Sequence, residues 1–211
     1  MDFVKGGKGF VGIHAATDSF YKCPEFGEMI IGYFSGHPWT AGTPVSIKVE
    51  PGREDHPIVK HLGGKNMDFK EEIYQLKEPY DSSKVHMLLR LDTTRSKMDV
   101  RGIRRTDGDF GVSWIRKWGK GRVFYTASGH DHRVWDQPNF HDLLKRAIYW
   151  AVGDETRGKL EALALPEFEM MDVKLPGYIQ RKLVTQVPKP FSPEESLKLA
   201  QVPPGFELSL F

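Results

Sequence analysis

The chain has 211 residues, of which 39% are hydrophobic, and a formal net charge of +2 at pH 7. This length allows one ordinary domain with additional chain, and the near balance of charge gives no support for a nucleic-acid or membrane-surface partner. No apolar run approaches the length of a membrane span, and the first residues lack the apolar core of a signal peptide, which leaves the compartment open. The single cysteine, Cys23, excludes an internal disulfide and is interpreted as a small structural residue.

The first 153 residues mix strand-like and helix-like patterns. Strands are predicted at residues 10–14, 45–50, 69–76, 85–91, 111–118 and 122–128, the last two joined as a hairpin by a glycine-containing turn. Apolar residues at three- and four-residue steps predict helices at 24–34 and 138–152, each beginning at a proline, and a short helix is predicted within 56–62. Residues 93–109 are charged and irregular, which predicts a surface loop.

The character of the chain changes after Gly153. Half of the 14 prolines follow it, and the apolar periodicity is weak. Residues 154–211 are therefore predicted to be a proline-rich linker leading to an absent domain, with one short helix starting at Ser192 and a strand beginning within 205–211. The strand at 10–14 has no earlier strand to pair with, so we also expect that one or more preceding βα units are missing.

Two predicted strands end in a histidine, His14 in Ile13-His14-Ala15 and His130 in Gly129-His130-Asp131. Ligands of open α/β sheets bind outside the carboxyl ends of the strands, so both histidines are candidate catalytic residues. The structural alternative is a histidine that only hydrogen-bonds loop carbonyls at the end of the sheet.

Three further side chains could join them in one site. Glu72 could supply a carboxylate and Tyr74 a hydroxyl to a sugar or a metal, although Glu72 could equally be an exposed strand residue. His37 is either a site residue or a former of the turn after its helix. His14, His37 and His130 together could bind a divalent metal such as zinc, provided that the fold brings them together.

Three more residues are candidates for substrate binding. Trp39 and Trp135 adjoin the histidine loops and could stack on a sugar, although most tryptophans belong to the core. Asp18 is either a site carboxylate or a residue that caps backbone N–H groups. The basic residues between Arg95 and Arg105 are interpreted as a solvated face.

With these residues in view, the sequence resembles the ThuA-like (trehalose utilisation) family. The segments that carry the resemblance are residues 9–18, 32–39, 71–74, 105–110 and 119–126. The resemblance implies an α/β fold of the flavodoxin-like, class I glutamine amidotransferase-like type: three layers, with a mostly parallel sheet between helices, formed here by a domain of residues 1–153. In the amidotransferases the first elbow presents a nucleophilic cysteine. His14 takes that place here, and an imidazole cannot form the required thioester, so glutaminase activity is not expected.

The resemblance also implies a function in carbohydrate utilisation, on a disaccharide or its 3-keto derivative. The expected chemistry is acid/base work at the enolisable centre of a keto-sugar, with His14 or His130 as the base and Glu72 as its partner. The alternative is a non-catalytic sugar-binding or interaction module that positions substrate for a fused dehydrogenase.

Residues 191–206 resemble the entry into a planctomycete-type, membrane-bound dehydrogenase module with a β-propeller and often haem c. Such a module implies a longer parent protein that is exported to the periplasm or cell envelope. The chain has no Cys-x-x-Cys-His motif for attaching haem.

Overall fold

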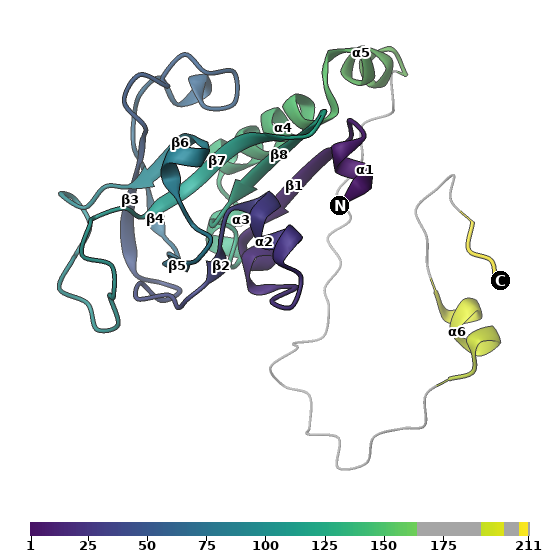
Figure 1. Cartoon of the computed structure of the whole chain (residues 1–211), viewed down its shortest axis with the longest axis horizontal. Helices are drawn as coiled ribbons and strands as arrows, with labels where there is room; N and C mark the ends of the chain where they lie inside the picture. The colour runs from purple at the N-terminus through teal and green to yellow at the C-terminus, as the bar shows by residue number, and fades with distance from the viewer. Residues whose placement is uncertain (164–190, 201–206, 211) are drawn as a thin grey trace. The chain divides into compact units, whose positions relative to one another are not determined.

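A curled, mixed sheet forms the centre of the first of two units, Met1–Leu165 and Pro166–Phe211 (Figure 1). The structure is a computed structural model that describes residues 1–163, 191–200 and 207–210. The sheet has six strands in the order β1-β8-β7-β6-β3-β4. Their bounds are β1 Gly9–Ile13, β3 Pro44–Val49, β4 Met67–Lys70, β6 His86–Leu91, β7 Gly111–Trp118 and β8 Gly121–Thr126.

The expectation of a mostly parallel sheet is wrong for this unit. Strands β1 and β8 pair in parallel, whereas the pairs β8-β7, β7-β6, β6-β3 and β3-β4 are all antiparallel. For the pair β7-β8 the reason is the short connection, because a parallel pair needs a crossover of a dozen or more residues. Only two residues, Gly119 and Lys120, join β7 to β8, and Gly119 has a φ of 58° that suits a tight turn.

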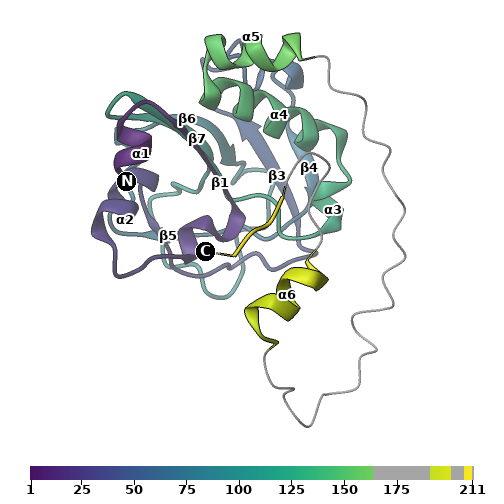
Figure 2. The same ribbon diagram turned by 90° about the vertical axis from the view of Figure 1, so that its right-hand side faces the viewer.

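Helices cover the sheet from two sides. The helix α4 (Pro138–Val152) packs Phe140, Leu143 and Ala147 into one hydrophobic cluster, and α2 (Pro24–Ile30) packs Phe26 and Met29 into a second. In the view of Figure 2, strands of the sheet lie between these two helices.

Strand β8 shows why two clusters form. Phe124 belongs to the cluster with α4, and Val123 and Tyr125 belong to the cluster with α2, as expected when successive side chains of a strand point to opposite faces. The structure is thus an α/β fold consistent with the flavodoxin-like type. Its three-layer, amidotransferase-like detail and a missing βα unit stay predictions.

Two predicted elements are shorter than expected. The helix predicted over 24–34 ends at Ile30, because Ile31 takes a left-handed conformation with a φ of 60°. The next residues form β2 (Tyr33–Phe34), which pairs with β5 (Leu76–Lys77). The strand predicted over 69–76 leaves the main sheet after Lys70, and its second half crosses to residues 36–39, where Ile73 N–H donates to the Trp39 carbonyl over 3.0 Å.

Short elements complete the unit. They are α1 (Asp2–Lys5), α3 (His132–Trp135) and the 3₁₀ turns η1 (His14–Asp18), η2 (Lys60–Leu62) and η3 (Ser82–Lys84). The short helix expected within 56–62 is the single turn η2. The loop at 93–109 is irregular, as predicted, but Met98, Val100 and Ile103 pack against the core.

The predicted linker begins with a helix rather than an extended segment, namely α5 (Asp154–Ala162). The short helix expected at Ser192 is confirmed as α6 (Pro193–Leu199), because Ser192 and Glu195 form a reciprocal capping box. Residues 207–210 form no strand, and the rest of the strand expected within 205–211 lies outside the described residues, as does most of the predicted proline-rich linker. Among the described residues, every helix is too short or too polar to cross a membrane.

Asp92 fixes the start of the 93–109 loop. Its buried carboxylate accepts hydrogen bonds from Thr94 N–H (3.0 Å), Thr94 Oγ1 (2.7 Å) and Asn66 Nδ2 (2.9 Å). These bonds, chiefly the one from the Thr94 hydroxyl, lower the pKa of Asp92 from 3.8 to about 2. The unfolded chain therefore holds the proton more tightly, and the stabilisation by Asp92 is lost as the pH falls from about 4 to about 2.

Asp92→Asn is expected to reduce the free energy of unfolding by on the order of 1–2 kcal/mol at pH 7, because it places an amide N–H₂ against Asn66. The difference in free energy of unfolding between the variant and wild type should become smaller as the pH is lowered to 2.5. Urea unfolding of both proteins across this range measures it. A difference that stays constant with pH would contradict the assignment.

Candidate functional site

The chain turns sharply where β1 ends. His14 follows Ile13 with a φ of 44°, an unusual conformation for a residue other than glycine, and starts the turn η1. Two hydrogen bonds fix this elbow from below: Tyr125 Oη donates to the His14 carbonyl over 2.9 Å and lies 2.9 Å from Thr17 Oγ1. Strained backbone held in this way is frequent at functional sites. A sharp turn at His14 is therefore present, and its correspondence to the elbow of the amidotransferases stays a prediction.

The parallel pairing of β1 and β8 brings the second histidine to the first. Ile13 pairs with Thr126, so both strands end at the same edge of the sheet, and His130 follows β8 by four residues. His14 Nε2 lies 3.1 Å from His130 Nδ1. The His14 side chain is 12% exposed and that of His130 is 38% exposed, so His130 stands at the mouth of the site.

Glu72 joins these histidines from a third segment. Its Oε2 lies 3.1 Å from His14 Nε2 and 3.1 Å from His130 Nδ1, and its side chain is 9% exposed. The three atoms therefore form an almost equilateral triangle, and we call His14, Glu72 and His130 the triangle cluster. The structure thus brings together the three residues predicted from the sequence to be catalytic.

The His14 ring has a defined tautomer. Its Nδ1 lies 2.6 Å from the Ala127 carbonyl oxygen, which can only accept, so Nδ1 carries the hydrogen and donates. Burial lowers the pKa of His14 below its usual range, although the bond to Ala127 and the charge of Glu72 oppose the shift. A neutral His14 with a protonated Nδ1 has its lone pair on Nε2, which faces the cluster. The structural alternative, a bond to a loop carbonyl, is thus observed, and the role of His14 as a site residue stays a prediction.

Tyr74 supplies a hydroxyl to the cluster. Its Oη lies 2.9 Å from His14 Nε2, and its ring contacts His14 and Phe34 with centroids 4.4 and 4.5 Å apart. Burial, with the nearby charge of Glu72, raises the pKa of Tyr74 far above its usual range. The hydroxyl therefore keeps its proton and donates to the His14 lone pair.

His37 contacts the cluster through the other oxygen of Glu72. Its Nδ1 lies 3.2 Å from Glu72 Oε1, and its ring stacks on Phe34 at 5.7 Å. An open cavity of about 350 Å³ adjoins His37 and is also lined by Gln75, Arg101 and Arg104. Arg101 and Arg104 are exposed, which agrees with their interpretation as part of a solvated face, and they also lie at the rim of this cavity.

Two positioning residues were missed by the sequence reasoning. Glu71 is 1% exposed, and its carboxylate accepts from Gly129 N–H (2.8 Å) and Glu72 N–H (2.7 Å), which ties the His130 loop to the Glu72 segment. Burial raises the pKa of Glu71 above its usual range. Gln75, 2% exposed, bonds the Gly102 carbonyl (2.8 Å) and Arg104 N–H (2.9 Å) and so holds the cavity loop. The acidic doublet Glu71-Glu72 was the one visible signal.

The remaining candidates lie apart from the cluster. Asp18 is exposed and accepts a hydrogen bond from Tyr21 Oη. Burial, and secondly this bond, raise the pKa of Tyr21 to about 12. Trp135 is 41% exposed and donates from Nε1 to the Gly129 carbonyl over 3.0 Å, beside the His130 loop, so its role in binding stays a prediction.

Trp39 belongs to the core. Its side chain is fully buried, packs edge-on against Phe110 at 5.0 Å, and donates from Nε1 to the Lys97 carbonyl over 2.7 Å. A buried ring cannot stack on a sugar, so the structure does not support Trp39 as a substrate-binding residue.

Trp39→Phe is therefore expected to lower the free energy of unfolding by about 1–3 kcal/mol, because the Lys97 carbonyl loses its buried donor. Sugar binding by the folded variant should match wild type. Urea unfolding and sugar titration by NMR measure the two effects. Lost sugar binding with unchanged stability would restore Trp39 to the site.

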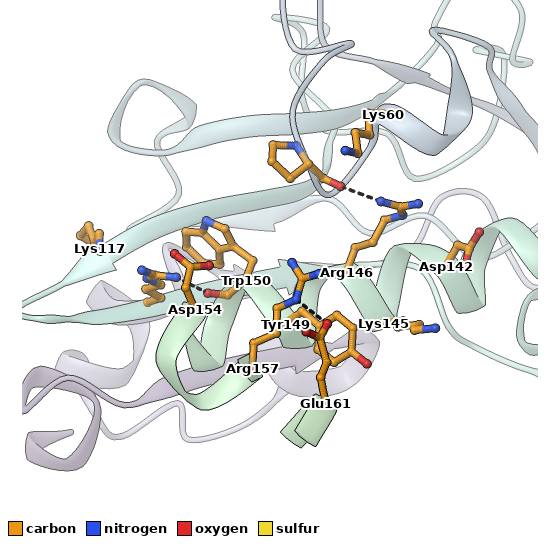
Figure 3. A pocket seen from close by; sticks show the side chains of 12 residues that line it. Lys60, Lys117, Asp142, Lys145, Arg146, Tyr149, Trp150, Asp154, Arg157 and Glu161 are labelled. Carbon is orange, nitrogen blue, oxygen red and sulfur yellow. Dashed lines mark hydrogen bonds and ion pairs between the residues drawn. The ribbon is translucent and has the colours of Figure 1, made fainter. Parts of the chain in front are cut away.

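A larger cavity, of about 710 Å³, lies elsewhere, beside α4 and α5 (Figure 3). Its three arginines are engaged with the backbone or with a carboxylate, Arg146 through the Pro57 carbonyl. Arg122 donates to the Trp150 carbonyl over 2.7 Å, and Arg157 pairs with Glu161 at 2.8 Å. We therefore place the candidate site at the triangle cluster rather than in this cavity.

Fold and site together define an α/β domain with a His–Glu–His cluster at the carboxyl edge of its one parallel strand pair. Residues 1–151 match the ThuA family, described as trehalose utilisation, and because this match covers most of the chain, the chain belongs to the ThuA family.

Solved structures agree with this assignment. A ThuA-like protein from Bacteroides uniformis is 27% identical with a TM-score of 0.56, over 72% of this chain and 61% of that one. One from Parabacteroides merdae is 19% identical with a TM-score of 0.53, over 72% and 62%, and supports the fold alone. The chain thus spans about three fifths of the length of these relatives. No curated protein matched the sequence.

Proposed function

We propose that this domain acts on a carbohydrate, a disaccharide or its 3-keto derivative, at the triangle cluster. The observation that carries the proposal is the convergence of a lone-pair nitrogen, a carboxylate and a second imidazole within 3.1 Å of one another in a member of the ThuA family. Mutually close titratable groups at the carboxyl edge of a sheet are typical of catalytic sites.

The chemistry we propose is proton transfer beside a ketone. A base takes the proton from the carbon next to the keto group. The C–H electron pair forms the C=C bond of an enolate, and the π pair of the carbonyl moves to its oxygen, which gains the negative charge. His14 Nε2 or His130 is suited to take the proton, with Glu72 stabilising the imidazolium. Tyr74, whose hydroxyl keeps its proton, is suited to donate a hydrogen bond to the enolate oxygen.

The cavity next to His37 supports a polar, hydroxyl-rich ligand. Its rim presents the cations of Arg101 and Arg104 and the amide of Gln75, all groups that can donate hydrogen bonds. Gln75 already bonds the loop backbone, so it holds the rim, and the two arginines and His37 are the groups that face a ligand. Glutaminase activity is not part of the proposal, because His14 occupies the elbow and an imidazole forms no thioester.

One NMR experiment tests the function. The full chain is incubated with trehalose and with 3-keto-trehalose in D₂O, and chemical-shift changes, deuterium incorporation and new products are followed. Deuterium entering next to the keto group, or a new keto-sugar isomer, supports the proposed chemistry. Saturable binding without turnover, unaltered by His14→Ala, instead supports a sugar-binding module that presents substrate to a dehydrogenase. If the chain neither binds nor converts either sugar, both the enzymatic function and the sugar-binding module are contradicted.

A further inference from the structure

We propose that His14 Nε2, Glu72 Oε2 and His130 Nδ1 bind one divalent transition-metal ion of the zinc class, with open coordination positions for water or substrate. The inference deepens the proposed function, since it concerns the same site, and it rests on that function only for the identity of the substrate. The ion itself is argued from the geometry of the three donor atoms.

The size of the triangle fits a metal ion. All three donor-to-donor distances are 3.1 Å. Zinc lies about 2.0–2.2 Å from histidine nitrogens and carboxylate oxygens. Three such ligands on one face of an octahedral or tetrahedral ion are therefore about 2.9–3.5 Å apart, which is the separation observed here.

The protonation of the cluster also favours a cation. His14 Nδ1 donates to the Ala127 carbonyl over 2.6 Å, so Nε2 is an acceptor, and Glu72 Oε2 is an acceptor as well. Without an ion, Tyr74 Oη donates to Nε2 over 2.9 Å, but no proton lies between Nε2 and Glu72 Oε2, and two acceptors 3.1 Å apart repel one another unless a proton or a cation lies between them. A metal ion would accept the lone pairs of His14 Nε2 and Glu72 Oε2. It would also accept the lone pair of His130 Nδ1 when the hydrogen of that ring is on Nε2.

The surroundings hold the donors in place, as is usual around metal ligands. The Ala127 carbonyl fixes the His14 ring, and the buried carboxylate of Glu71 joins Gly129 to Glu72 with bonds of 2.8 and 2.7 Å. Ligands arranged before the ion arrives lose little conformational entropy on binding.

His37, expected from the sequence to be the third histidine ligand, has a different place. It contacts Glu72 Oε1, the oxygen that points away from the triangle, over 3.2 Å. His37 is thus suited to orient the Glu72 carboxylate, and Glu72, rather than His37, is the third ligand of the proposed site. Two imidazoles with one carboxylate suit zinc, iron(II), cobalt(II) or nickel(II) better than magnesium or calcium, which prefer oxygen.

A bound ion would also divide the chemistry among the residues. It would polarise the keto oxygen of the substrate as a Lewis acid. With the ion bound, both imidazole lone pairs would be occupied, so neither His14 nor His130 would be the base. His37, whose Nδ1 lies 3.2 Å from Glu72 Oε1, is then the imidazole suited to take the proton, and Tyr74 remains a hydrogen-bond donor.

The test is calorimetric titration of the full chain, stripped with chelator, with ZnCl₂ and separately with MgCl₂. We expect one zinc per chain, no comparable binding of magnesium, and an affinity about 100-fold lower or worse in Glu72→Gln and His130→Ala. His132→Ala is the matched control, since this exposed histidine lies outside the cluster and should leave the affinity unchanged. His130 is 38% exposed, so its variant should fold, and circular dichroism verifies this.

The outcomes are separable from those of the sugar experiment. Stoichiometric zinc binding lost in both cluster variants supports the metal site, even if no sugar reacts. Absence of saturable zinc binding, or binding that both variants retain, overturns it, even if deuterium exchange in the keto-sugar persists and the proposed function stands. Cobalt(II) absorption gives a second readout, because its visible bands should shift in His130→Ala and not in His132→Ala.

Discussion

His14→Ala should slow deuterium exchange beside the keto group of 3-keto-trehalose by about 10²–10⁴-fold, the usual contribution of a general acid or base. The expectation follows from the geometry, because Nε2 is the one atom within hydrogen-bond distance of Glu72, His130 and Tyr74. It holds whether this nitrogen takes the proton itself or binds an ion that activates the ketone. NMR of the sugar in D₂O, with wild type and variant at equal concentration, gives the two rates.

Two controls make the result interpretable. His132→Ala changes a nearby exposed histidine and should exchange at the wild-type rate. His14 also adopts a left-handed φ of 44°, so His14→Asn, which tolerates that conformation better than alanine, shows whether backbone strain alone matters. Wild-type exchange by either His14 variant would exclude this nitrogen from the chemistry.

Much of the fold could be predicted because local patterns specify it. The glycine turn between β7 and β8, the proline-initiated helix α4 and the short helix starting at Ser192 all appear as the sequence indicates. The direction of the strands could not be predicted from a resemblance, since it depends on which strands are neighbours in space. The early end of α2 could not be predicted either, because Tyr33 and Phe34 continue the helical spacing of apolar residues although they pair with β5.

Site residues at strand ends could be predicted from the sequence. Residues whose position depends on tertiary packing could not. His14 and His130 lie 116 positions apart, and only the parallel pairing of β1 with β8 makes them neighbours. Glu71 and Gln75 were missed because both act through backbone hydrogen bonds to distant loops. Trp39 was assigned to the site for its proximity in sequence to His37, but the chain buries its ring against Phe110.

The largest effect on stability is expected for Trp114→Ala, with a loss of about 3–5 kcal/mol in the free energy of unfolding. Trp114 is fully buried in the cluster beside α2, packs at a tilt of 43° against Tyr125 with centroids 4.5 Å apart, and donates from Nε1 to the Ile30 carbonyl over 3.1 Å. Alanine would leave a cavity on the sheet and an unpaired carbonyl at the end of the helix. Urea unfolding at pH 7 measures the loss.

Trp114→Phe separates the two causes, because it keeps an aromatic ring but removes the donor, and it should lose about 1–3 kcal/mol. Equal losses in both variants would mean that the hydrogen bond, not the packing, dominates. The alanine variant should also disturb the site, since Tyr125 holds the His14 carbonyl over 2.9 Å and rests on Trp114. A Trp114→Ala protein that is folded at low temperature is therefore expected to bind zinc more weakly than Trp114→Phe, because the elbow that aims His14 has lost the support beneath it.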